Sequence, residues 1–471
     1  MSWLTICYNN KKTLLDCRVF LLSEFIAGIE HIMAKDEIIA IIGGGLAGSE
    51  AAWQALRRGI HVRLYEMRPR KMTAAHKTGL LGELVCSNSL RSANEFSAPG
   101  LLKKELSMGG SLIMEAARQT AVPAGSALAV DRRLFGEFIT ERISSHPDIE
   151  IINEEVDEIR ERPCIVATGP LTSEALSETL GRMLGADHLY FYDAIAPIVD
   201  ADSIDHSRVF RASRYGKGGD DYLNCPMNRE EYERFYNALI DADSVSAREF
   251  EDKRVFEGCM PIEVMARRGK DTPRFGPMKP VGIRDPGTGS EPFAVVQLRV
   301  ENREETAYNI VGFQTRLKWP EQKRVFSLIP GLERAEFLRF GSIHRNTFIN
   351  GPGFLNTDLT LKVDEGVYIA GQLSGVEGYI ESTAMGLISG INVSRSIRKK
   401  GFAEVPVETA HGALLRYITG SSPEGFQPSN INFGLFPSTG IRTGDKRKRR
   451  EEIVKRALNC WEDYLNRIGN G

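Results

Sequence analysis

The segment 38–66 constrains the fold more than any other stretch of the chain. It opens with the apolar run IIAII at 38–42, which is typical of a buried parallel strand. A small-residue helix is predicted over Ser49–Arg58, and a second strand over His61–Tyr65 ends next to the acid Glu66. Strand, glycine turn, helix and strand in this order predict a Rossmann-like unit, and therefore an α/β fold that binds a dinucleotide.

The turn between this first strand and the helix carries glycines with GxGxxG spacing, at Gly43, Gly45 and Gly48. We expect Gly43 to allow a tight turn, Gly45 to let a pyrophosphate approach the backbone, and Gly48 to let the helix pack close to the strand. The helix N-terminus then offers free N–H groups and a positive dipole to the phosphates. The residues predicted to bind the cofactor here are Gly43, Gly44, Gly45, Leu46, Ala47 and Gly48.

An isolated glycine motif could also be an ordinary turn, but the flanking strands and the acid at Glu66 favour a nucleotide site. Glu66 follows the glycines by about twenty residues, the spacing from which a carboxylate accepts hydrogen bonds from a ribose diol. This acid indicates a free 2′-hydroxyl group on the ribose, and therefore FAD or NAD rather than NADP at this site.

Length and composition limit the other possibilities. The chain has 471 residues, 42% of them hydrophobic, and a formal net charge of −2. The length suggests about two to three domains, and the net charge excludes a global attraction to polyanions, so that any such site must be a local patch. Seven scattered cysteines without a CxxC pair or zinc spacing indicate reduced thiols, no metal site and a cytoplasmic location. No apolar run approaches the roughly 18 residues of a membrane span, so no membrane contact is expected.

The predicted architecture is a discontinuous, Rossmann-like FAD-binding domain that is interrupted by an inserted α+β domain. The character of the sequence changes near Tyr190, where antiparallel strands are predicted at Tyr190–Val199 and Pro292–Val300. The expected boundaries are 33–189 for the first part of the FAD-binding domain, 190–335 for the insertion, and 336–471 for the second part with a C-terminal helix.

The second part begins with a strand at Gly366–Ala370, which runs into a glycine turn and a long small-residue helix within Gly371–Arg395. This is a second dinucleotide-type element, and its helix N-terminus is expected to face the flavin ring or the pyrophosphate. Gly371 and Gln372 are therefore predicted to bind the cofactor. The chain ends in a basic helix over Lys446–Asn466.

The remaining elements of the first part have simpler patterns. One helix is predicted over Leu101–Arg118 and another over Ala129–Ile143, with an N-cap near Asp131. Strands are predicted over Ile149–Val156 and Pro163–Thr168.

Two polar loops of the insertion are rich in basic residues. The loop Arg267–Arg284 holds six basic residues and one acid, and Arg211, Arg214 and Lys217 form a second basic loop. On composition alone, a solvated charged face and a track for a phosphate backbone are equally supported.

Two cysteines lie in polar loops rather than in apolar runs. Cys86 is in VCSNS with Arg91 nearby, and Cys259 is in FEGCMPIE. Loop cysteines near cations or helix starts can act as thiolates, although packing is the more frequent role for either one alone. A single histidine such as His344 is likewise more often structural than catalytic.

Five motifs together resemble one family. GGGLAGSEAAWQ, ELVCSNSLRS, FEGCMPIE, GSIHRNTFIN and GQLSGVEGYIESTAMGL are similar to those of the folate- and FAD-dependent tRNA (uracil-5-)-methyltransferases, the TrmFO family, which is related to the GidA/MnmG flavoproteins. The resemblance runs from about Met33 to the C-terminus. The stretch 1–32 matches nothing in the family and is assigned no role; it is either an extra helix or an unused upstream start.

This resemblance implies an activity. The family converts the T-loop uridine of tRNA to ribothymidine, with carbon from 5,10-methylenetetrahydrofolate and electrons from NADH or NADPH through FAD. Uracil C5 is a poor nucleophile until a thiolate adds at C6. The family motifs assign that addition to Cys259 and place Cys86 near the flavin, with a role in handling the methylene group or removing the C5 proton.

The resemblance also implies substrate contacts. His344 is expected to stack the folate pterin against the isoalloxazine, and Tyr379 to lie close to the same pocket. The basic loop, with Arg267, Arg268 and Lys270, then has a purpose, which is to hold the T-arm of tRNA. No NAD(P)H site and no stable protein partner are evident in the sequence.

Three alternatives remain open at this point. The same chemistry on a ribosomal RNA uridine shares every motif. An FAD-dependent oxidoreductase acting on a small molecule would need neither Cys259 nor RNA. A flavin-bound RNA-binding module without chemistry would bind tRNA in a salt-dependent way after both cysteines are lost.

Overall fold

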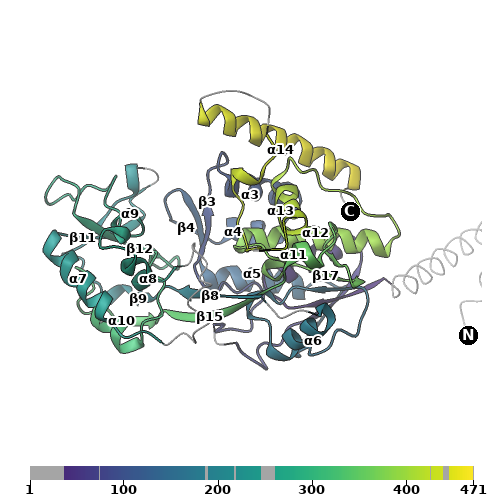
Figure 1. The fold of residues 1–471 in the computed structure, drawn as a ribbon, viewed down its shortest axis with the longest axis horizontal. Coiled ribbons are helices and arrows are strands. Elements are labelled where there is room, and N and C mark those ends of the chain that lie inside the picture. Colours follow the sequence, from purple (N-terminus) through teal and green to yellow (C-terminus); the bar gives the residue numbers. More distant parts are fainter. Residues whose placement is uncertain are drawn as a thin grey trace, which may run out of the picture.

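Two separate sheets organise the chain into two lobes in the computed structural model (Figure 1). The structure describes residues 37–73, 75–185, 189–216, 219–245, 260–424, 426–438 and 445–469, with side chains except at 189–195, 342–346 and 446. The predictions for 1–32, Lys217 and Cys259 lie outside the described residues.

The larger lobe is built on a six-stranded sheet with the order β16-β17-β7-β1-β2-β6. All neighbouring pairs are parallel except β16–β17. Its central strands are buried because helices cover both faces, as the predicted apolar run requires. The strands are β1 (Ile38–Ile42), β2 (His61–Tyr65), β6 (Ile149–Ile152), β7 (Cys164–Val166), β16 (Thr360–Leu361) and β17 (Asp364–Ile369).

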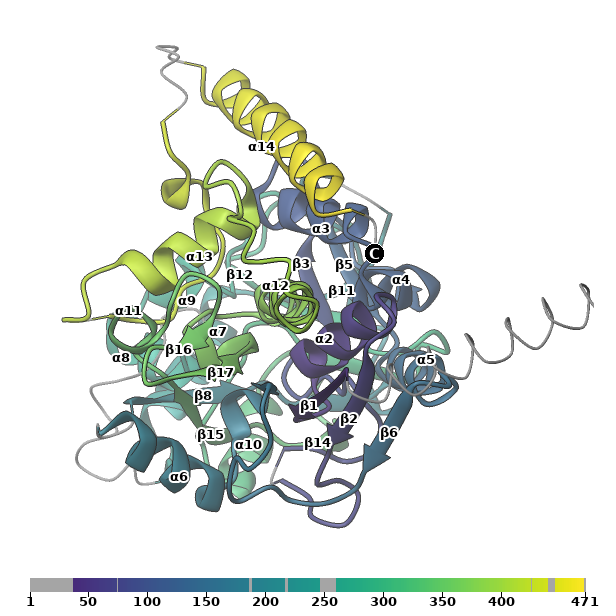
Figure 2. The same cartoon turned by 90° about the vertical axis from the view of Figure 1, so that its right-hand side faces the viewer.

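Helices α2 (Leu46–Leu56) and α12 (Tyr379–Ile397) lie side by side in the centre of Figure 2. A Cβ atom at Gly386 would overlap the carbonyl oxygen of Ala47, and one at Gly390 would lie 2.7 Å from that of Ala51. The two backbones therefore touch only because small residues line the contact. The other helices of this lobe are α3 (Ala98–Met108), α4 (Leu112–Gln119), α5 (Arg132–Ser144), α6 (Glu174–Leu184), α11 (Gly351–Phe354), α13 (Ala410–Gly420) and α14 (Lys446–Ile468).

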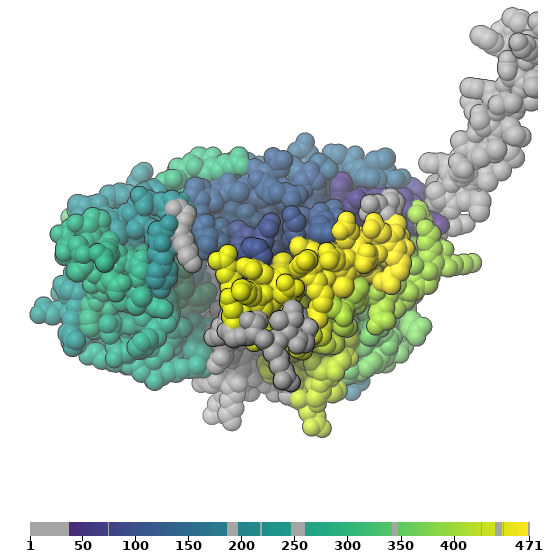
Figure 3. Space-filling model, turned by 90° about the horizontal axis from the view of Figure 1, so that it is seen from above, coloured from purple at the N-terminus to yellow at the C-terminus, as the bar shows by residue number. Residues whose placement is uncertain are grey.

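Helix α14 lies across the outer surface of the larger lobe (Figure 3). Its Trp461 is fully buried and donates from Nε1 to the carbonyl of Glu105 at 2.8 Å. The same indole stacks on the buried ring of His411 at 4.2 Å. One face of the C-terminal helix thus packs into the hydrophobic core of this lobe.

The smaller lobe has an antiparallel sheet with the order β10-β11-β12-β13-β9-β14 and its own hydrophobic core. Its strands are β9 (Ile198–Asp200), β10 (Phe210–Arg211), β11 (Tyr222–Met227), β12 (Ala294–Val300), β13 (Ala307–Ile310) and β14 (Phe337–Arg339). Its helices are α7 (Arg229–Asp241), α8 (Ile262–Arg267), α9 (Thr272–Phe275) and α10 (Trp319–Phe326). The sheet arrangement confirms an α/β protein with an inserted α+β part, while the exact boundaries at 190 and 335 stay predictions.

A two-stranded ribbon joins the lobes (Figure 1). Strand β8 (Leu189–Ile195) pairs antiparallel with β15 (Ser342–Phe348), with His344 opposite Asp193. A three-stranded sheet packs against the smaller lobe through Ala129. It consists of β3 (Ser89–Ser92), β4 (Ala121–Val122) and β5 (Ala127–Val130).

The predicted helix over Leu101–Arg118 is wrong, because the chain forms α3 and α4 there. The break falls at Gly110, which has φ +70°, and Ser111, whose side chain caps α4 by accepting from Met114 N. The helix predicted over Ala129–Ile143 begins only at Arg132, after the strand β5.

The predicted N-cap Asp131 is confirmed, since its Oδ1 accepts from the backbone of Arg133 and Leu134 at 3.0 Å each. The predicted strand Tyr190–Val199 is divided between β8 and β9, which belong to different sheets. The strand predicted over Pro292–Val300 is confirmed as β12, which pairs antiparallel with β11 and β13. The strand predicted over Ile149–Val156 stops at Ile152, and the first helix begins at Leu46 rather than at Ser49.

In the part of the chain that the structure describes, no helix combines the length and the apolar character that crossing a membrane requires.

Candidate functional site

The glycine turn after β1 has the geometry that its spacing predicts. Gly43 has φ +103°, and a Cβ atom there would lie 2.8 Å from the carbonyl oxygen of Ala167. A Cβ at Gly48 would overlap the carbonyl oxygen of Gly43. These two positions must be glycine for the turn to close and for α2 to approach the sheet.

Gly45 differs from both. It is the N-cap of α2, with φ −72° and ψ −168°, which any residue can adopt. Among the described residues, apart from Gly45 itself and its two neighbours in the chain, no atom lies within 4 Å of a Cβ placed there. The space beside Gly45 is open toward the helix N-terminus, so the protein itself does not require a glycine here, whereas a closely approaching ligand would.

Glu66 ends β2 next to this turn and is only 6% exposed. Its Oε1 accepts from the backbone N–H and Nε of Arg68 at 3.0 and 2.9 Å. Its Oε2 accepts from Gly44 N at 2.9 Å and from a guanidinium nitrogen of Arg68 at 3.0 Å. Burial alone would raise the pKa of Glu66, but the hydrogen bonds and charge of Arg68 outweigh it and hold the pKa below its ordinary value.

These four bonds use the whole acceptor capacity of the Glu66 carboxylate. In this structure Glu66 therefore anchors the glycine turn through Gly44 and orients Arg68. A ribose hydroxyl would have to share one of these acceptor positions. The ribose contact of Glu66 stays a prediction.

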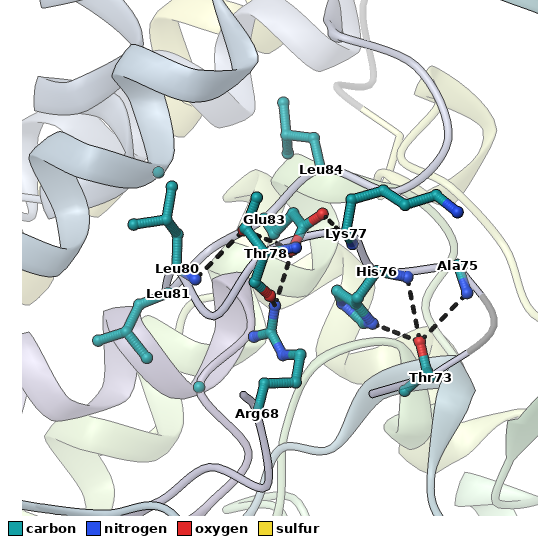
Figure 4. Close-up of polar contacts among 12 residues, drawn as sticks. Arg68, Thr73, Ala75, His76, Lys77, Thr78, Leu80, Leu81, Glu83 and Leu84 are labelled. Atoms are coloured by element: carbon teal, nitrogen blue, oxygen red, sulfur yellow. Dashed lines mark hydrogen bonds and ion pairs between the residues drawn. The ribbon is translucent and has the colours of Figure 1, made fainter. Parts of the chain in front are cut away.

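Arg68, which donates to Glu66, also contacts the loop that follows, where it points toward Glu83 and Thr78 (Figure 4). It is 2% exposed and donates to Glu83 Oε2 at 3.0 Å. Glu83 also accepts from the backbone and hydroxyl of Thr78 at 3.1 and 2.8 Å. Thr73 Oγ1 lies 2.6 Å from His76 Nδ1. This network orders the loop along one wall of a groove.

The groove consists of two connected cavities. The first, of about 540 Å³, is lined by the glycine turn, Glu66 and Arg68. The second, of about 1190 Å³ including space open to solvent, is lined by Cys86 and Tyr379 among others. Both are lined by Gly45, His76, Thr168 and Leu171, which makes them one elongated site. Its shape, with a glycine turn in the middle, suits a dinucleotide.

The second glycine turn lines the same groove. Gly371 has φ +71°, and a Cβ there would lie 2.7 Å from the Cβ of Ala47 in the first turn of α2. Gln372 donates from Nε2 to Glu377 Oε2 at 2.7 Å. Helix α12 begins directly afterwards at Tyr379, so that the positive ends of α2 and α12 face one cavity.

The backbone of Cys86 is held from both sides. Its N–H donates to the hydroxyl of Tyr379 at 2.8 Å. Its carbonyl accepts from Arg132 at 2.7 Å and from Arg339 at 2.8 Å. Arg339 also donates to the carbonyl of Val85 at 3.1 Å. The larger lobe supplies the tyrosine, and Arg339 reaches the loop from β14 of the smaller lobe.

A third arginine contacts the same loop. Arg299 of β12 donates to Asn88 Oδ1 at 3.0 Å and to Ser87 Oγ at 2.7 Å. Among the described residues, the only carboxylate that forms an ion pair with any of these three arginines is Glu301, whose Oε2 lies 2.5 Å from Nε of Arg132.

Burial and the neighbouring charge of Arg132 lower the pKa of Arg339 to about 10. Burial lowers the pKa of Arg299 as well. Burial alone would lower the pKa of Arg132, but Glu301 raises it overall. All three remain cationic at neutral pH, which leaves an excess of positive charge around Cys86. Positive charge close to a thiol is characteristic of nucleophilic cysteines.

The other predicted site residues are more scattered. Cys259 is outside the described residues, and Met260 directly after it is buried. His344 is in β15 of the connecting ribbon, and only its backbone is described. Arg267, Arg268 and Lys270, all described, line neither cavity and lie at the end of α8 in the smaller lobe.

Sequence patterns did not single out the arginines that hold the Cys86 loop. One signal was present, because Arg299 stands in AVVQLRV and Arg339 in EFLRF, each a cation within an otherwise apolar strand. A buried charge of this kind requires partners. Among the described residues, no group of three or more His, Cys, Asp or Glu side chains could hold a metal ion.

Comparisons with known proteins agree with this geometry. The model of the family "Glucose inhibited division protein A" matches residues 38–401. Two crystal forms of GidA from Aquifex aeolicus superpose with TM-scores of 0.67 and 0.65, at 18% and 17% identity. They cover 90% of this chain and 73% and 75% of those chains.

The fold and the groove therefore define an α/β protein of the GidA type, with a Rossmann-like dinucleotide-binding domain. The methylenetetrahydrofolate–tRNA-(uracil-5-)-methyltransferase TrmFO of Natranaerobius thermophilus is 57% identical over 430 residues, 91% of this chain and 99% of the relative. That of Moorella thermoacetica is 57% identical over 437 residues, 93% of this chain and all of the relative. The chain belongs to the TrmFO family, as its five motifs indicate.

Proposed function

We propose that this protein methylates C5 of the T-loop uridine of tRNA, with 5,10-methylenetetrahydrofolate as carbon donor and FAD reduced by NADH or NADPH. We infer the reaction type from the family to which the chain belongs. The observation in this chain that supports it best is the single groove in which the glycine turn, the start of α12 and Cys86 meet.

The residues present fit FAD. The open space at Gly45 lies at the N-terminus of α2, where free N–H groups would hold the pyrophosphate. Gly371, Gln372 and the start of α12 line the wider cavity, where they would contact the ring system. When bound there, FAD would transfer electrons from the nicotinamide donor to the one-carbon unit.

Cys86 and Tyr379 would act on the reacting groups in the wider cavity. Burial raises the pKa of Tyr379 above its ordinary value, so its phenol stays protonated and can donate one hydrogen bond while it accepts from Cys86 N. The positive charge around Cys86 favours an anionic role, as the base that removes the C5 proton. Cys259 is proposed as the nucleophile that adds to C6 of uracil and thereby activates C5.

RNA would bind across the smaller lobe. Arg267 donates to the carbonyl of Ile240 at 2.9 Å, and Lys270 pairs with Glu233 at 2.9 Å. Both are at the surface, beside Arg268, and we propose that this basic edge contacts phosphates of the T-arm. The folate pterin would be held by His344. A tRNA substrate and reduced thiols also support a cytoplasmic location.

The test is a methylation assay with an unmodified tRNA transcript, 5,10-methylenetetrahydrofolate and NADPH. We expect methylation that disappears when the T-loop uridine is changed to cytidine. Cys259→Ala should keep its FAD but lose methylation and any covalent adduct with RNA that contains 5-fluorouracil. Methylation of ribosomal RNA instead of tRNA would change the substrate, and flavin reduction without any RNA product would point to a small-molecule oxidoreductase.

A further inference from the structure

A column of aromatic rings leads from the core of the smaller lobe to its surface. Trp319, the first residue of α10, stacks on Phe340 with ring centroids 5.3 Å apart and planes 13° apart. Phe340 stacks on Phe337 at 5.0 Å and 11°. Phe337 contacts Phe326, which packs in an edge arrangement on the buried Phe313 at 5.6 Å. The column fixes the plane of its outermost ring.

That outermost ring is open to solvent. Trp319 is 63% exposed, whereas tryptophan side chains are highly buried on average. Its stacking on Phe340 and Phe337 is nearly parallel, and the next ring in such a stack would be another flat ring placed on the outer side of the indole. An exposed ring held in this plane suits a planar aromatic ligand.

The charges around the column favour an anionic ligand. Lys318 pairs with Asp243 at 3.1 Å, and Arg324 with Glu321 at 2.6 Å. Lys323 lies 6.0 Å from the centroid of Phe340 and forms no ion pair among the described residues. One positive charge that forms no ion pair among the described residues therefore remains beside Phe340, the ring on which Trp319 stacks. A planar ring that carries negative charge nearby is the chemistry of a nucleotide.

The column is also connected to the proposed reaction site. Phe340 directly follows Arg339, which donates to the carbonyls of Val85 and Cys86. Gln322 of α10 donates to the carbonyl of Gly341 at 2.9 Å, just before β15 begins. Figure 1 shows α10 beside the end of the β8–β15 ribbon that meets the smaller lobe. A nucleotide bound at Trp319 would thus be a near neighbour of one bound over Cys86.

We propose that Trp319 is a stacking platform for an unpaired base of the RNA substrate, with Lys323 contacting an adjacent phosphate. Aromatic platforms beside basic side chains are the usual means of holding unpaired nucleotides. The platform would fix the nucleotides next to the target uridine while that base enters the groove. This inference rests on the proposed RNA substrate, and assigns to it a contact outside the reaction site.

The experiment measures binding of an unmodified tRNA transcript to the FAD-loaded protein. Trp319→Ala should bind roughly 5- to 150-fold more weakly, the range expected when one base–aromatic stack is lost. Trp319→Phe should retain most of the affinity because it keeps a ring. Leu338→Ala is the matched control, since Leu338 is 56% exposed on the neighbouring strand and is outside the aromatic column.

Two further readouts separate stacking from a general loss of structure. Wild-type tryptophan emission should be quenched by tRNA, and this quenching should be absent in Trp319→Phe. The dependence of log Kd on log salt should be unchanged in Trp319→Ala, whereas Lys323→Gln should reduce its slope by about one phosphate contact.

Equal tRNA affinity of Trp319→Ala and wild type would overturn the platform and leave the proposed function intact, provided that tRNA is still methylated. A change of oligomeric state in Trp319→Ala at unchanged RNA affinity would also overturn it, and would assign the indole to a protein contact. If the wild type binds no tRNA, the proposed function and the platform fail together.

Discussion

Gly45 allows the cofactor site to be perturbed separately from the fold. In Gly45→Ala, the new methyl group meets no atom within 4 Å in the described part of the chain beyond the two neighbouring residues, and φ −72° is an ordinary value for alanine. Replacing glycine by alanine lowers the conformational entropy of the unfolded chain, which stabilises the folded protein by about 0.4–1 kcal/mol. Alanine is, however, a poorer N-cap than glycine by roughly 0.5–1 kcal/mol. These effects nearly cancel, so the cofactor-free protein should keep its stability to within about 0.5 kcal/mol.

The same methyl group would occupy space at the helix N-terminus that the pyrophosphate needs. We expect Gly45→Ala to bind FAD at least tenfold more weakly, which corresponds to about 1.4 kcal/mol. Gly48→Ala is the contrasting variant, because its Cβ would overlap the carbonyl oxygen of Gly43. Gly48→Ala should lose FAD, and its free energy of unfolding should fall by about 3 kcal/mol or more, since the overlapping atom belongs to the backbone and cannot rotate away.

The assay combines urea unfolding of the cofactor-free variants with a flavin titration followed by the change in flavin fluorescence. Normal FAD affinity in Gly45→Ala would refute the assignment of the open space to the pyrophosphate. Marked destabilisation of cofactor-free Gly45→Ala would refute the conclusion that the protein does not itself require glycine there.

Two other predictions concern charge. Because Arg68 holds the pKa of Glu66 below its ordinary value of 4.5, the pair stabilises the fold at neutral pH, and this contribution is lost as the pH falls through 4.5 and then through the lower folded pKa. Glu66→Gln should therefore be less stable by roughly 3 kcal/mol at pH 7. In urea unfolding at a series of pH values, this difference in stability from wild type should shrink below about pH 5. A difference that stays constant with pH would contradict the ion pair. Arg339→Gln should slow alkylation of Cys86 by iodoacetamide at neutral pH and move its pH profile upward, because one positive charge near the thiol is removed. Arg339→Lys should restore much of the rate. Mass spectrometry of the Cys86 peptide measures the alkylation, and an unchanged pH profile in Arg339→Gln would exclude an electrostatic role of Arg339.

The local part of the site was predictable from the sequence. The roles of Gly43 and Gly48 follow from spacing alone, and the structure shows the close backbone contacts that exclude a side chain at both. The signals for the break between α3 and α4 were also local, since Gly109, Gly110 and Ser111 are a typical helix end and N-cap. The helical periodicity continues on both sides of these three residues and so masks the break.

The contacts that hold Cys86 could not be predicted in the same way. Arg339 and Cys86 are 253 residues apart, and Arg299 and Asn88 are 211 apart. Nothing in a local pattern specifies which loop a strand arginine will reach. Glu66 illustrates a different limit, because its partner Arg68 is only two residues away, but the pairing depends on the fold of the loop up to Glu83.

The contact between α2 and α12 determines when the cofactor site can form during synthesis. The strand β1 and the helix α2 leave the ribosome early, but β17 and α12, which complete the sheet and the groove, follow some three hundred residues later. The smaller lobe, whose strands and helices all lie between them, has its own core and can form first. The nascent chain must therefore keep the exposed edge of β7 and the small-residue face of α2 unpaired until the last third is made. Flavin can bind only to a nearly finished chain.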